Sequence, residues 1–328
     1  MSTSIKAITV KKNGGPANMI WEEKFLSPLK KDQVTIKHTY VGLNFIDTYH
    51  RSGLYPLPLP TPLGMEGAGV IIEKGSDVRD FNLGDRVSYV MALGSYSTHR
   101  NIEASKIVKT PASISDQEAA AIMLKGMTVE YLVERLFKVN TNHTVLFHAA
   151  AGGVGLIACQ WLKKLGARVI GTVGSEEKAS LAKENGCSEV ILYKKENFVS
   201  KVREITDNAG VDVVYDGVGK DTAIDGLDCL KPLGTMVVFG NSSGNCPPVD
   251  PSLLASKGSL FFTRPTLMNY ATKREDLLHS SKRVFDMLQG KVIELEINSS
   301  YDLSDVVKAH TDLELRKTYG SIVMKNNY

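Results

Sequence analysis

One stretch of the chain limits the possible folds more than any other: an apolar run that meets a glycine-rich turn and then a helix. It reads Val145-Leu-Phe-His-Ala-Ala-Ala-Gly-Gly-Val-Gly155 and continues into the amphipathic segment 156–165. The turn follows the pattern G-x-G-x-x-G with Ala150 in place of the first glycine. Such a turn lets the backbone approach a diphosphate, and the start of the helix directs its free N–H groups at the phosphates. The residues expected at the diphosphate are Gly152, Gly153, Val154 and Gly155.

A tight strand-to-helix turn without a ligand is the alternative interpretation of this stretch. The continuation of the chain favours a dinucleotide, because short apolar runs and helical segments alternate from about Lys138 onward. Strands are expected at 168–172, 189–193, 211–216, 235–239 and 259–262, and helices at 176–184, 199–205 and 223–230, with Gly186 closing the first of these helices. Parallel strands joined by helices predict an α/β fold with a doubly wound sheet, whose ligand lies at the carboxyl ends of the strands.

The first third of the chain is rich in β-strand patterns that are separated by turns. Strands are expected within 1–10, 34–41, 64–75 and 82–90, and the proline-rich segment 51–62 is interpreted as a loop that wraps a cleft. Ser115 and Glu118 form a capping-box pattern that begins a helix running through Leu124. The tail is expected to form a helix over 275–289 and a strand over 320–324, and to rejoin the first domain. The expected domains are residues 1–124 plus 266–328, and residues 125–265.

The composition excludes several classes of protein. A chain of 328 residues with 43% hydrophobic and 23% charged residues is typical of a globular protein with two domains. The formal net charge of +3 gives no reason to expect nucleic acid or a membrane surface as a partner, and no run approaches the roughly 20 apolar residues of a membrane span. The four scattered cysteines contain no C-x-x-C pair, so disulfides are not expected and a cytoplasmic, reducing compartment is favoured.

The end of the second strand of a dinucleotide fold selects between NAD and NADP. An acidic residue there binds the ribose 2′-hydroxyl and repels a 2′-phosphate. Here the strand ends at Gly174 and Ser175, which leave room and supply a hydroxyl, and Lys178 follows one turn later. Glu176 and Glu177 fall at the start of the next helix, where carboxylates are favoured in any case. NADP is therefore expected rather than NAD, although Lys178 could also be an ordinary solvated helix lysine.

Several motifs together resemble one protein family. They are Asn44-Phe-Ile-Asp-Thr-Tyr49, Arg51-Ser-Gly-Leu-Tyr55, the glycine-rich turn, Asn241-Ser-Ser-Gly244 and Thr263-Arg-Pro-Thr266. The chain resembles the zinc-free quinone oxidoreductases of the medium-chain dehydrogenase/reductase superfamily, the zeta-crystallin-like group, over essentially its whole length. The resemblance implies a GroES-like, β-rich catalytic domain, a Rossmann nucleotide domain, and a cleft between them that holds NADPH.

The resemblance also implies roles for particular residues. Asn44 and Tyr49 match cleft residues beside the nicotinamide, and Thr128 matches a position near the nicotinamide ribose and amide. Lys178 and Tyr193 match the residues that hold the adenosine 2′-phosphate. The remaining positions implied near the cofactor are Phe239, Ser242, Arg264 and Arg316. Without the resemblance, Asn44 could cap a turn, Tyr193 could be a strand-end aromatic, and Arg264 could pair with an acid at a domain seam.

The sequence predicts an enzyme without a metal. Zinc-dependent members of the superfamily carry Gly-His-Glu where this chain reads Gly64-Met-Glu66, and a thioether is a poor zinc ligand. No cysteine lies near Asn44, and no cysteine cluster could bind a structural zinc. Without a Lewis acid a simple ketone loses its usual oxyanion stabiliser, whereas a quinone is an easier acceptor because its reduced form is aromatic. We therefore expect reduction of a quinone by NADPH, with Tyr49 bonding the quinone oxygen and Asn44 fixing the nicotinamide or the substrate.

Three further expectations concern alternatives and partners. An NADPH-dependent reductase of enone or alkenal double bonds shares the fold and the cofactor, and the sequence leaves it open. A binding role as a crystallin-like or RNA-binding protein belongs to another class, and the small net charge and the lack of a basic-aromatic tract stand against RNA. The apolar segment 260–262 is expected at a sheet edge, which the resemblance implies is paired in a homodimer. Hydride transfer and one-electron transfer both stay open.

Overall fold

The structure, a computed structural model, describes residues 3–328, which divide into two compact units. Unit 1 comprises the residues up to Met127 together with Ala271–Gly290 and Leu295–Tyr328. Unit 2 comprises Thr128–Tyr270 and Lys291–Glu294. The tail residues thus belong to the same unit as the first third of the chain. The functional domain boundaries expected after residues 124 and 265 stay predictions.

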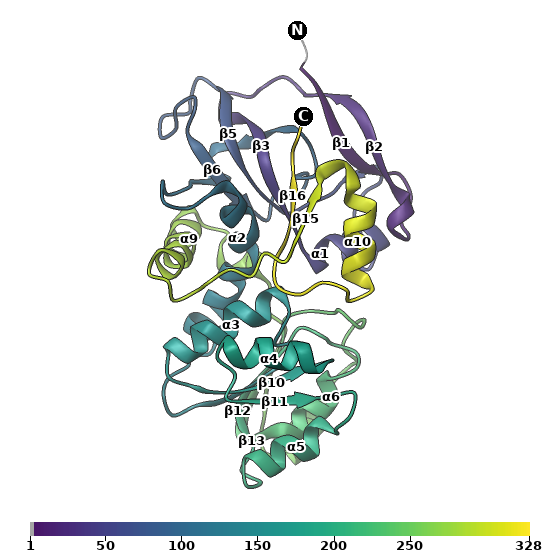
Figure 1. The fold of residues 1–328 in the computed structure, drawn as a ribbon, viewed down its shortest axis with the longest axis vertical. Helices are drawn as coiled ribbons and strands as arrows, with labels where there is room; N and C mark the ends of the chain where they lie inside the picture. The colour runs from purple at the N-terminus through teal and green to yellow at the C-terminus, as the bar shows by residue number, and fades with distance from the viewer. Residues whose placement is uncertain (1–2) are drawn as a thin grey trace. The chain divides into compact units, whose positions relative to one another are not determined.

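Unit 2 is built on a sheet of six parallel strands in the order β11-β10-β9-β12-β13-β14, which is the doubly wound topology that the sequence predicts (Figure 1). Its central strands are buried on both faces, so their apolar residues do not alternate with polar ones, although β12 also carries the buried Asp212 and Asp216. The strands are β9 (Thr144–Phe147), β10 (Arg168–Val173), β11 (Glu189–Leu192), β12 (Val211–Asp216), β13 (Leu230–Val238) and β14 (Phe261–Thr263).

The helices of unit 2 cover this sheet, and a core cluster joins β9, β10 and β12 to α5 and to the segment after α6. The helices are α3 (Gly153–Lys164), α4 (Glu176–Glu184), α5 (Phe198–Ile205), α6 (Ala223–Gly226), α7 (Pro251–Ser256) and α8 (Leu267–Tyr270). The helix expected over 223–230 is wrong in length, because α6 tightens into a 3-10 turn at Leu227–Cys229 and β13 already begins at Leu230.

Unit 1 contains two sheets. A three-stranded sheet has the order β2-β1-β4, and a seven-stranded sheet has the order β15-β16-β3-β5-β6-β8 with β7 paired to β3. The C-terminal strand β16 runs antiparallel beside β3, as Figure 1 shows in yellow and purple. The strands are β1 (Ser4–Val10), β2 (Met19–Phe25), β3 (Gln33–Leu43), β4 (Thr61–Pro62), β5 (Glu66–Lys74), β6 (Arg86–Val90), β7 (His99–Glu103), β8 (Ile107–Lys109), β15 (Ser299–Asp302) and β16 (Ile322–Lys325).

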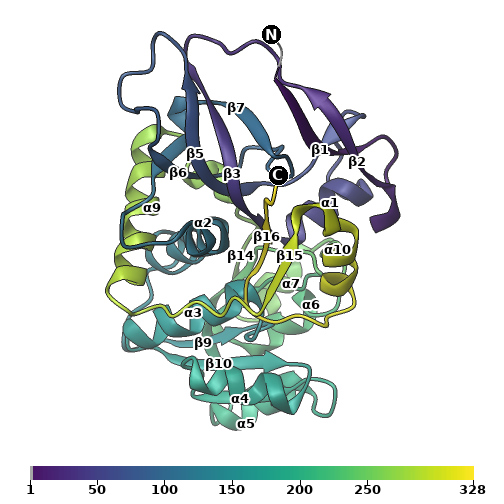
Figure 2. The same cartoon turned by 45° about the horizontal axis from the view of Figure 1, so that its top comes forward.

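The helices of unit 1 are α1 (Phe45–Ser52), α9 (Arg274–Gln289) and α10 (Val306–Glu314), and α2 (Asp116–Glu130) begins in this unit. The predicted capping box is present, since the Glu118 N–H donates to Ser115 Oγ at 3.2 Å and the Ser115 N–H donates to Glu118 Oε2 at 2.8 Å. Helix α9 lies beside α2 (Figure 2), and Gly126 lets the two helices approach closely, because a Cβ there would lie 2.7 Å from Val284 Cγ1. Within residues 3–328, every helix is too short or too polar to span a bilayer.

The segment 51–62 is mostly loop, as expected, but both of its ends are ordered elements. Helix α1 runs through Ser52, and Gly53 ends it with a φ of 85° in the left-handed region that favours glycine. At the other end, Thr61 and Pro62 form β4 at the edge of the three-stranded sheet. An edge position tolerates proline because its missing N–H would point away from the ladder.

Candidate functional site

The glycine-rich turn connects β9 to α3 as the sequence predicts. Gly152 is the N-cap of α3, and Gly153 and Val154 form its first turn. A Cβ on Gly155 would lie 2.4 Å from Ala149 O and 2.6 Å from Ala150 C, so only glycine lets this turn pack on the strand end. The first N–H groups of a 12-residue helix are therefore presented at the carboxyl end of β9, which fits a diphosphate.

The ends of β10 and β11 bring together the residues expected at the adenosine 2′-phosphate. A Cβ on Gly174 would lie 2.9 Å from Tyr193 Oη, so the tyrosine hydroxyl lies directly over this glycine. Ser175 caps α4 and accepts from the Lys178 N–H at 3.4 Å. Glu176 is paired with Lys195 at 2.8 Å, so its charge is balanced. A hydroxyl, a lysine and a 40% exposed tyrosine ring thus gather where an acid would select NAD.

The loops after β12 and β13 are joined through Asp216, a buried residue that the sequence did not single out. Its carboxylate accepts from the Val218 N–H at 2.6 Å, the Gly219 N–H at 3.1 Å and Thr222 Oγ1 at 2.8 Å. The Ser242 N–H donates to Gly217 O at 3.2 Å, and the Phe239 N–H donates to Asp216 O at 2.8 Å. The Asp216 carboxylate therefore fixes the loop after β12, and backbone hydrogen bonds join that loop to the predicted Phe239 and Ser242 after β13.

The remaining predicted cofactor residues lie at the ends of other elements. Thr128 lies in α2, is 7% exposed, and is the first residue of unit 2. Arg264 follows β14, and its guanidinium donates to Pro265 O at 2.8 Å. Arg316 follows α10 in unit 1 and has a φ of 59°. Their roles toward NADPH stay predictions.

In unit 1, the predicted Asn44 is the N-cap of α1, a helix that the sequence did not predict. The backbone N–H of Asn44 donates to Asp47 Oδ2 at 2.9 Å, and Asn44 and Asp47 form a reciprocal capping box at the start of α1. The capping interpretation of Asn44 is thus confirmed. Its side chain has a separate partner, because Nδ2 donates to Glu66 Oε2 at 2.9 Å.

Glu66 is the centre of a buried polar cluster that joins α1, β5 and α2. It is 0% exposed, and besides the Asn44 amide it accepts the Leu124 N–H at 2.7 Å through Oε1. The Lys125 ammonium lies 3.6 Å from Oε2. Burial raises the pKa of Glu66, and Lys125 and the hydrogen bonds oppose that rise. A neutralising cation and an oriented amide therefore surround one buried carboxylate.

A second buried chain of hydrogen bonds runs from Asp47 to α10. Tyr96 donates to Asp47 Oδ2 at 2.9 Å, His310 Nε2 lies 3.2 Å from the Tyr96 oxygen, and Arg51 donates to His310 Nδ1 at 3.1 Å. Arg51 also donates to both oxygens of Glu314. Because Arg51 donates to Nδ1, the proton of the neutral His310 is on Nε2. Burial raises the pKa of Asp47 to about 7 and lowers that of His310 to about 3.

Aromatic rings gather along α1 and the loop that follows it. Tyr49 is 8% exposed, and its ring centroid lies 6.4 Å from that of Phe45 and 5.1 Å from that of Tyr55. His50 lies 6.1 Å from Tyr55 in an edge-to-face arrangement. Flat aromatic ligands pack well against such surfaces. The predicted Tyr49 is therefore one member of an aromatic group rather than an isolated hydroxyl.

The position of the zinc-ligand histidine is occupied by Met65, which is buried and only 5% exposed. Over residues 3–328, no three His, Cys, Asp or Glu side chains are grouped so that they could hold a metal ion. The metal-independent interpretation of the sequence stays a prediction.

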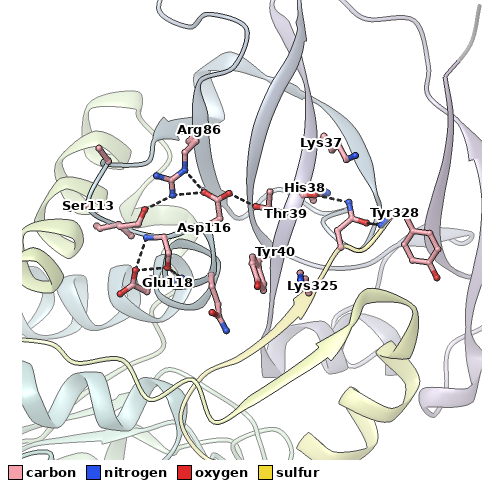
Figure 3. A pocket seen from close by; sticks show the side chains of 15 residues that line it. Lys37, His38, Thr39, Tyr40, Arg86, Ser113, Asp116, Glu118, Lys325 and Tyr328 are labelled. Carbon is pink, nitrogen blue, oxygen red and sulfur yellow. Dashed lines mark hydrogen bonds and ion pairs between the residues drawn. The ribbon is translucent and has the colours of Figure 1, made fainter.

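A cavity of about 740 Å³ in unit 1 lies apart from all the predicted site residues (Figure 3). Its polar groups satisfy one another: Arg86 donates to Asp116 Oδ1 at 2.8 Å, and Thr39 donates to Asp116 Oδ2 at 2.7 Å. The sticks in Figure 3 show these bonds crossing from α2 to the sheet. We interpret this cavity as the place where hydrogen bonds attach the start of α2 to the sheet.

Sequence reasoning missed Glu66 as a partner of Asn44, and it missed Lys125 and Asp216. A usable signal was present in each case, because each is a charged residue inside or at the end of an apolar run. Charged residues are seldom fully buried unless they are paired. A lone charge in a predicted core segment could therefore have identified these positions, although not their partners.

Comparisons with known proteins agree with this geometry. Residues 30–134 match the family described as alcohol dehydrogenase GroES-like domain, and residues 153–278 match the family described as zinc-binding dehydrogenase. The chain is 46% identical to a quinone oxidoreductase of Pseudomonas aeruginosa over 95% of its length and 96% of the relative. It is 42% identical to a 2-haloacrylate reductase of a Burkholderia species over 98% of both chains.

Among solved structures, the quinone oxidoreductase of Escherichia coli complexed with NADPH matches with a TM-score of 0.95 and 45% identity. The match covers 98% of this chain and 99% of that one. The GroES-like and Rossmann folds expected from the sequence are confirmed. The chain therefore belongs to the quinone oxidoreductase family of the medium-chain dehydrogenase/reductase superfamily.

Proposed function

We propose that this protein is an NADPH:quinone oxidoreductase, an enzyme that reduces a small quinone with NADPH. The observation that carries the proposal is the similarity, over 98% of the chain, to a quinone oxidoreductase whose structure contains NADPH. When bound, NADPH supplies the reducing equivalents, and the protein supplies binding and orientation.

The residues of unit 2 fit the cofactor. The start of α3 would bind the diphosphate, since its close turn leaves no room for a Cβ at Gly155. Ser175, Lys178 and Tyr193 would bind the 2′-phosphate, since they supply a hydroxyl, a cation and an aromatic face without a competing carboxylate at the strand end. These roles predict a preference for NADPH over NADH.

The residues of unit 1 fit the acceptor. The aromatic group at Phe45, Tyr49 and Tyr55 offers ring surfaces to a quinone. The Asn44 amide, oriented by Glu66, would fix the nicotinamide or the substrate. A quinone accepts electrons more readily than a simple ketone does, because its reduced form is aromatic.

Reduction of a conjugated carbon–carbon double bond is the second candidate. The 2-haloacrylate reductase relative, 42% identical over 98% of the chain, favours it specifically. That substrate class is small and carries no ring, whereas the aromatic group of unit 1 favours a flat ring. Both candidates use the same NADPH site, so only the acceptor separates them.

Steady-state oxidation of NADPH and of NADH with a small quinone, an enone, a 2-haloacrylate and a simple ketone tests the proposal. We expect turnover with NADPH and the quinone, slower turnover with NADH, and none with the ketone. Turnover with the enone or the haloacrylate alone would replace the quinone by the second candidate. Tight binding of NADPH without turnover on any acceptor would contradict both.

We also propose a homodimer formed through the edge of the six-stranded sheet. Strand β14 is the last strand of that sheet, and Phe261 on it is 60% exposed. An apolar edge strand is usually covered or paired. Phe261→Lys should shift the sedimentation coefficient from dimer to monomer, while Leu83→Lys, at a 62% exposed turn of unit 1, should not. A monomeric wild-type protein would contradict the proposal.

The four cysteines are free thiols in this fold, and Cys159 and Cys187 lie with their sulfurs 3.3 Å apart. Buried reduced thiols fit a reducing, cytoplasmic compartment, which we propose for this protein.

A further inference from the structure

Lys125 is a buried ammonium with too few partners. Its side chain is 6% exposed, and within residues 3–328 its Nζ forms no hydrogen bond. The closest carboxylate oxygen is Glu66 Oε2, at 3.6 Å. An ammonium group carries three N–H donors, and leaving them without acceptors in a protein interior costs several kcal/mol. An acceptor from outside the chain would remove this cost.

Glu66 balances the charge of Lys125 but does not satisfy its donors. Its two oxygens already accept the Leu124 N–H and the Asn44 amide at 2.7 and 2.9 Å. The pair is close to neutral as a whole, with a cation whose N–H groups are available. Such a pair suits a neutral ligand that becomes negative during a reaction, because the developing charge meets a preorganised donor.

We infer that the Lys125 ammonium donates a hydrogen bond to the oxygen of the bound acceptor on which negative charge develops, so that Lys125 is a catalytic residue. This inference rests on the proposed function for the reaction, and it names the acceptor class as conjugated carbonyl compounds. Lys125 and Asn44 share the same oxygen of Glu66, so the ammonium and the predicted nicotinamide-side amide belong to one cluster.

The chemical balance is simple. The quinone gains two electrons and one proton from NADPH and a second proton from water, and it leaves as the hydroquinone with NADP⁺. One C=O bond becomes a C–O⁻ bond before that second proton arrives. The Lys125 N–H donates a hydrogen bond to this oxygen and transfers no proton to it, so the lysine needs no regeneration. A charge-assisted hydrogen bond of this kind strengthens binding of the anion by about tenfold or more.

The experiment compares Lys125→Met with the wild-type protein, without cofactor, by calorimetric titration with two probes. One probe is an electron-poor phenol at a pH where it is a phenolate, which mimics the oxyanion, and the other is its neutral methyl ether. We expect the variant to bind the phenolate about tenfold more weakly or worse. Binding of the ether should change by no more than about twofold.

Matched variants separate this role from a structural one. Lys37→Met removes an exposed lysine of the same unit and should leave the affinity for both probes unchanged. Lys125→Arg keeps the charge and should restore most of the phenolate affinity. If thermal unfolding shows that Lys125→Met is not folded, Lys125→Gln replaces it with the same expected loss. Equal losses for phenolate and ether would overturn the inference.

The same titrations with NADP⁺ show whether the Lys125 ammonium donates to the acceptor or to the cofactor. If Lys125 donates to the acceptor, the affinity for NADP⁺ should be unchanged in Lys125→Met. A loss of affinity confined to NADP⁺ would show that the ammonium faces the cofactor and would overturn the inference.

Failure of the proposed function is a separate outcome. If quinone turnover is absent but phenolate binding depends on Lys125, the site stands and the natural acceptor is another conjugated carbonyl. If the protein reduces the quinone but phenolate binding does not depend on Lys125, the inference about Lys125 is wrong and the proposed function still holds.

Discussion

The two units differ in how deeply their polar site residues are buried. In unit 2 the groups expected at the cofactor lie at the ends of strands and loops, where Tyr193 is 40% exposed and Glu176 is paired across the surface. In unit 1 the polar cluster lies in the interior, with Glu66 at 0% and Lys125 at 6% exposure. The exposed groups of unit 2 cost little stability when no ligand is bound. The buried charges of unit 1 lower the stability of the folded protein.

This difference suggests a division of tasks. Exposed charges can bind a phosphate and release it, and their pairs contribute only about 0–1 kcal/mol to stability. Buried charges act more strongly on a reacting group, because the surroundings do not screen them. We therefore expect changes in unit 2 to alter mainly affinity, and changes in unit 1 to alter stability and reaction together.

The largest effect is expected for Glu66→Leu. The substitution leaves the Lys125 ammonium, the Leu124 N–H and the Asn44 amide without their acceptor. The free energy of unfolding, measured by urea denaturation, should fall by about 3–5 kcal/mol.

Two controls sharpen this measurement. Glu22→Leu removes the partly exposed partner of the exposed Lys11 and should cost no more than about 1 kcal/mol. Adding Lys125→Met to Glu66→Leu should recover part of the loss, since the unpaired charge is removed. Equal losses of unfolding free energy for Glu66→Leu and Glu22→Leu would show that burial of Glu66 does not increase the cost of removing its carboxylate.

Gly155→Ala should have the next largest effect. Its Cβ would lie 2.4 Å from Ala149 O, a backbone atom, so strand and helix must move apart. We expect a loss of about 1–3 kcal/mol in stability and much weaker NADPH binding, measured by fluorescence titration. Gly15→Ala is the matched control, because nothing lies within 4 Å of a Cβ built there. Unchanged NADPH affinity in Gly155→Ala would contradict the placement of the diphosphate.

Asp47 predicts a pH dependence in unit 1. Burial raises its pKa from 3.8 to about 7, with the Asn44 N–H, Tyr96, Glu66 and Lys125 facing it. A raised pKa in the folded state means that the stability from this group is present below pH 3.8 and is lost as pH rises toward 7. The wild-type protein should therefore lose about 1.4 kcal/mol per pH unit across this window relative to Asp47→Asn. Parallel stability curves for the two proteins would show that Asp47 does not titrate there.

The smallest effect on stability is expected for Lys178→Ala. The residue lies on α4 beside the strand end, so its loss should weaken NADPH binding about tenfold and leave NADH binding unchanged. Lys183→Ala, at an exposed position in the last turn of the same helix, should change neither affinity. Unfolding free energies of both variants should match the wild type within about 0.5 kcal/mol. An equal loss of NADPH and NADH binding would remove Lys178 from the phosphate site.

The same contrast explains what the sequence could predict. The strands and helices of unit 2 carry their signals locally: β9 is an apolar run that leads into the glycine-rich turn, Ser175 caps the start of α4, and Gly186, with a φ of 117°, follows its end. Topology then follows from the handedness of parallel connections. Residues near the cofactor could be proposed because they share the ends of those elements.

Unit 1 depends on contacts that no local pattern contains. Helix α1 was missed because it is short, is preceded by a strand and has a proline-rich loop after it. Asn44, Glu66 and Lys125 come from three distant segments, and only the packing of β5 and α2 brings them together. A charged residue inside an apolar run can be noticed in a sequence, but its partner and its chemical task depend on the tertiary fold.

Whether the protein reduces a quinone with NADPH is measured most directly in a single turnover, with enzyme in excess over NADPH and a small quinone. The loss of NADPH absorbance and the formation of hydroquinone are followed together after rapid mixing. One hydroquinone should form for each NADPH consumed, at a rate that falls strongly when NADH replaces NADPH. NADPH that persists in the presence of the quinone, but is consumed when a haloacrylate or an enone is added, would contradict it.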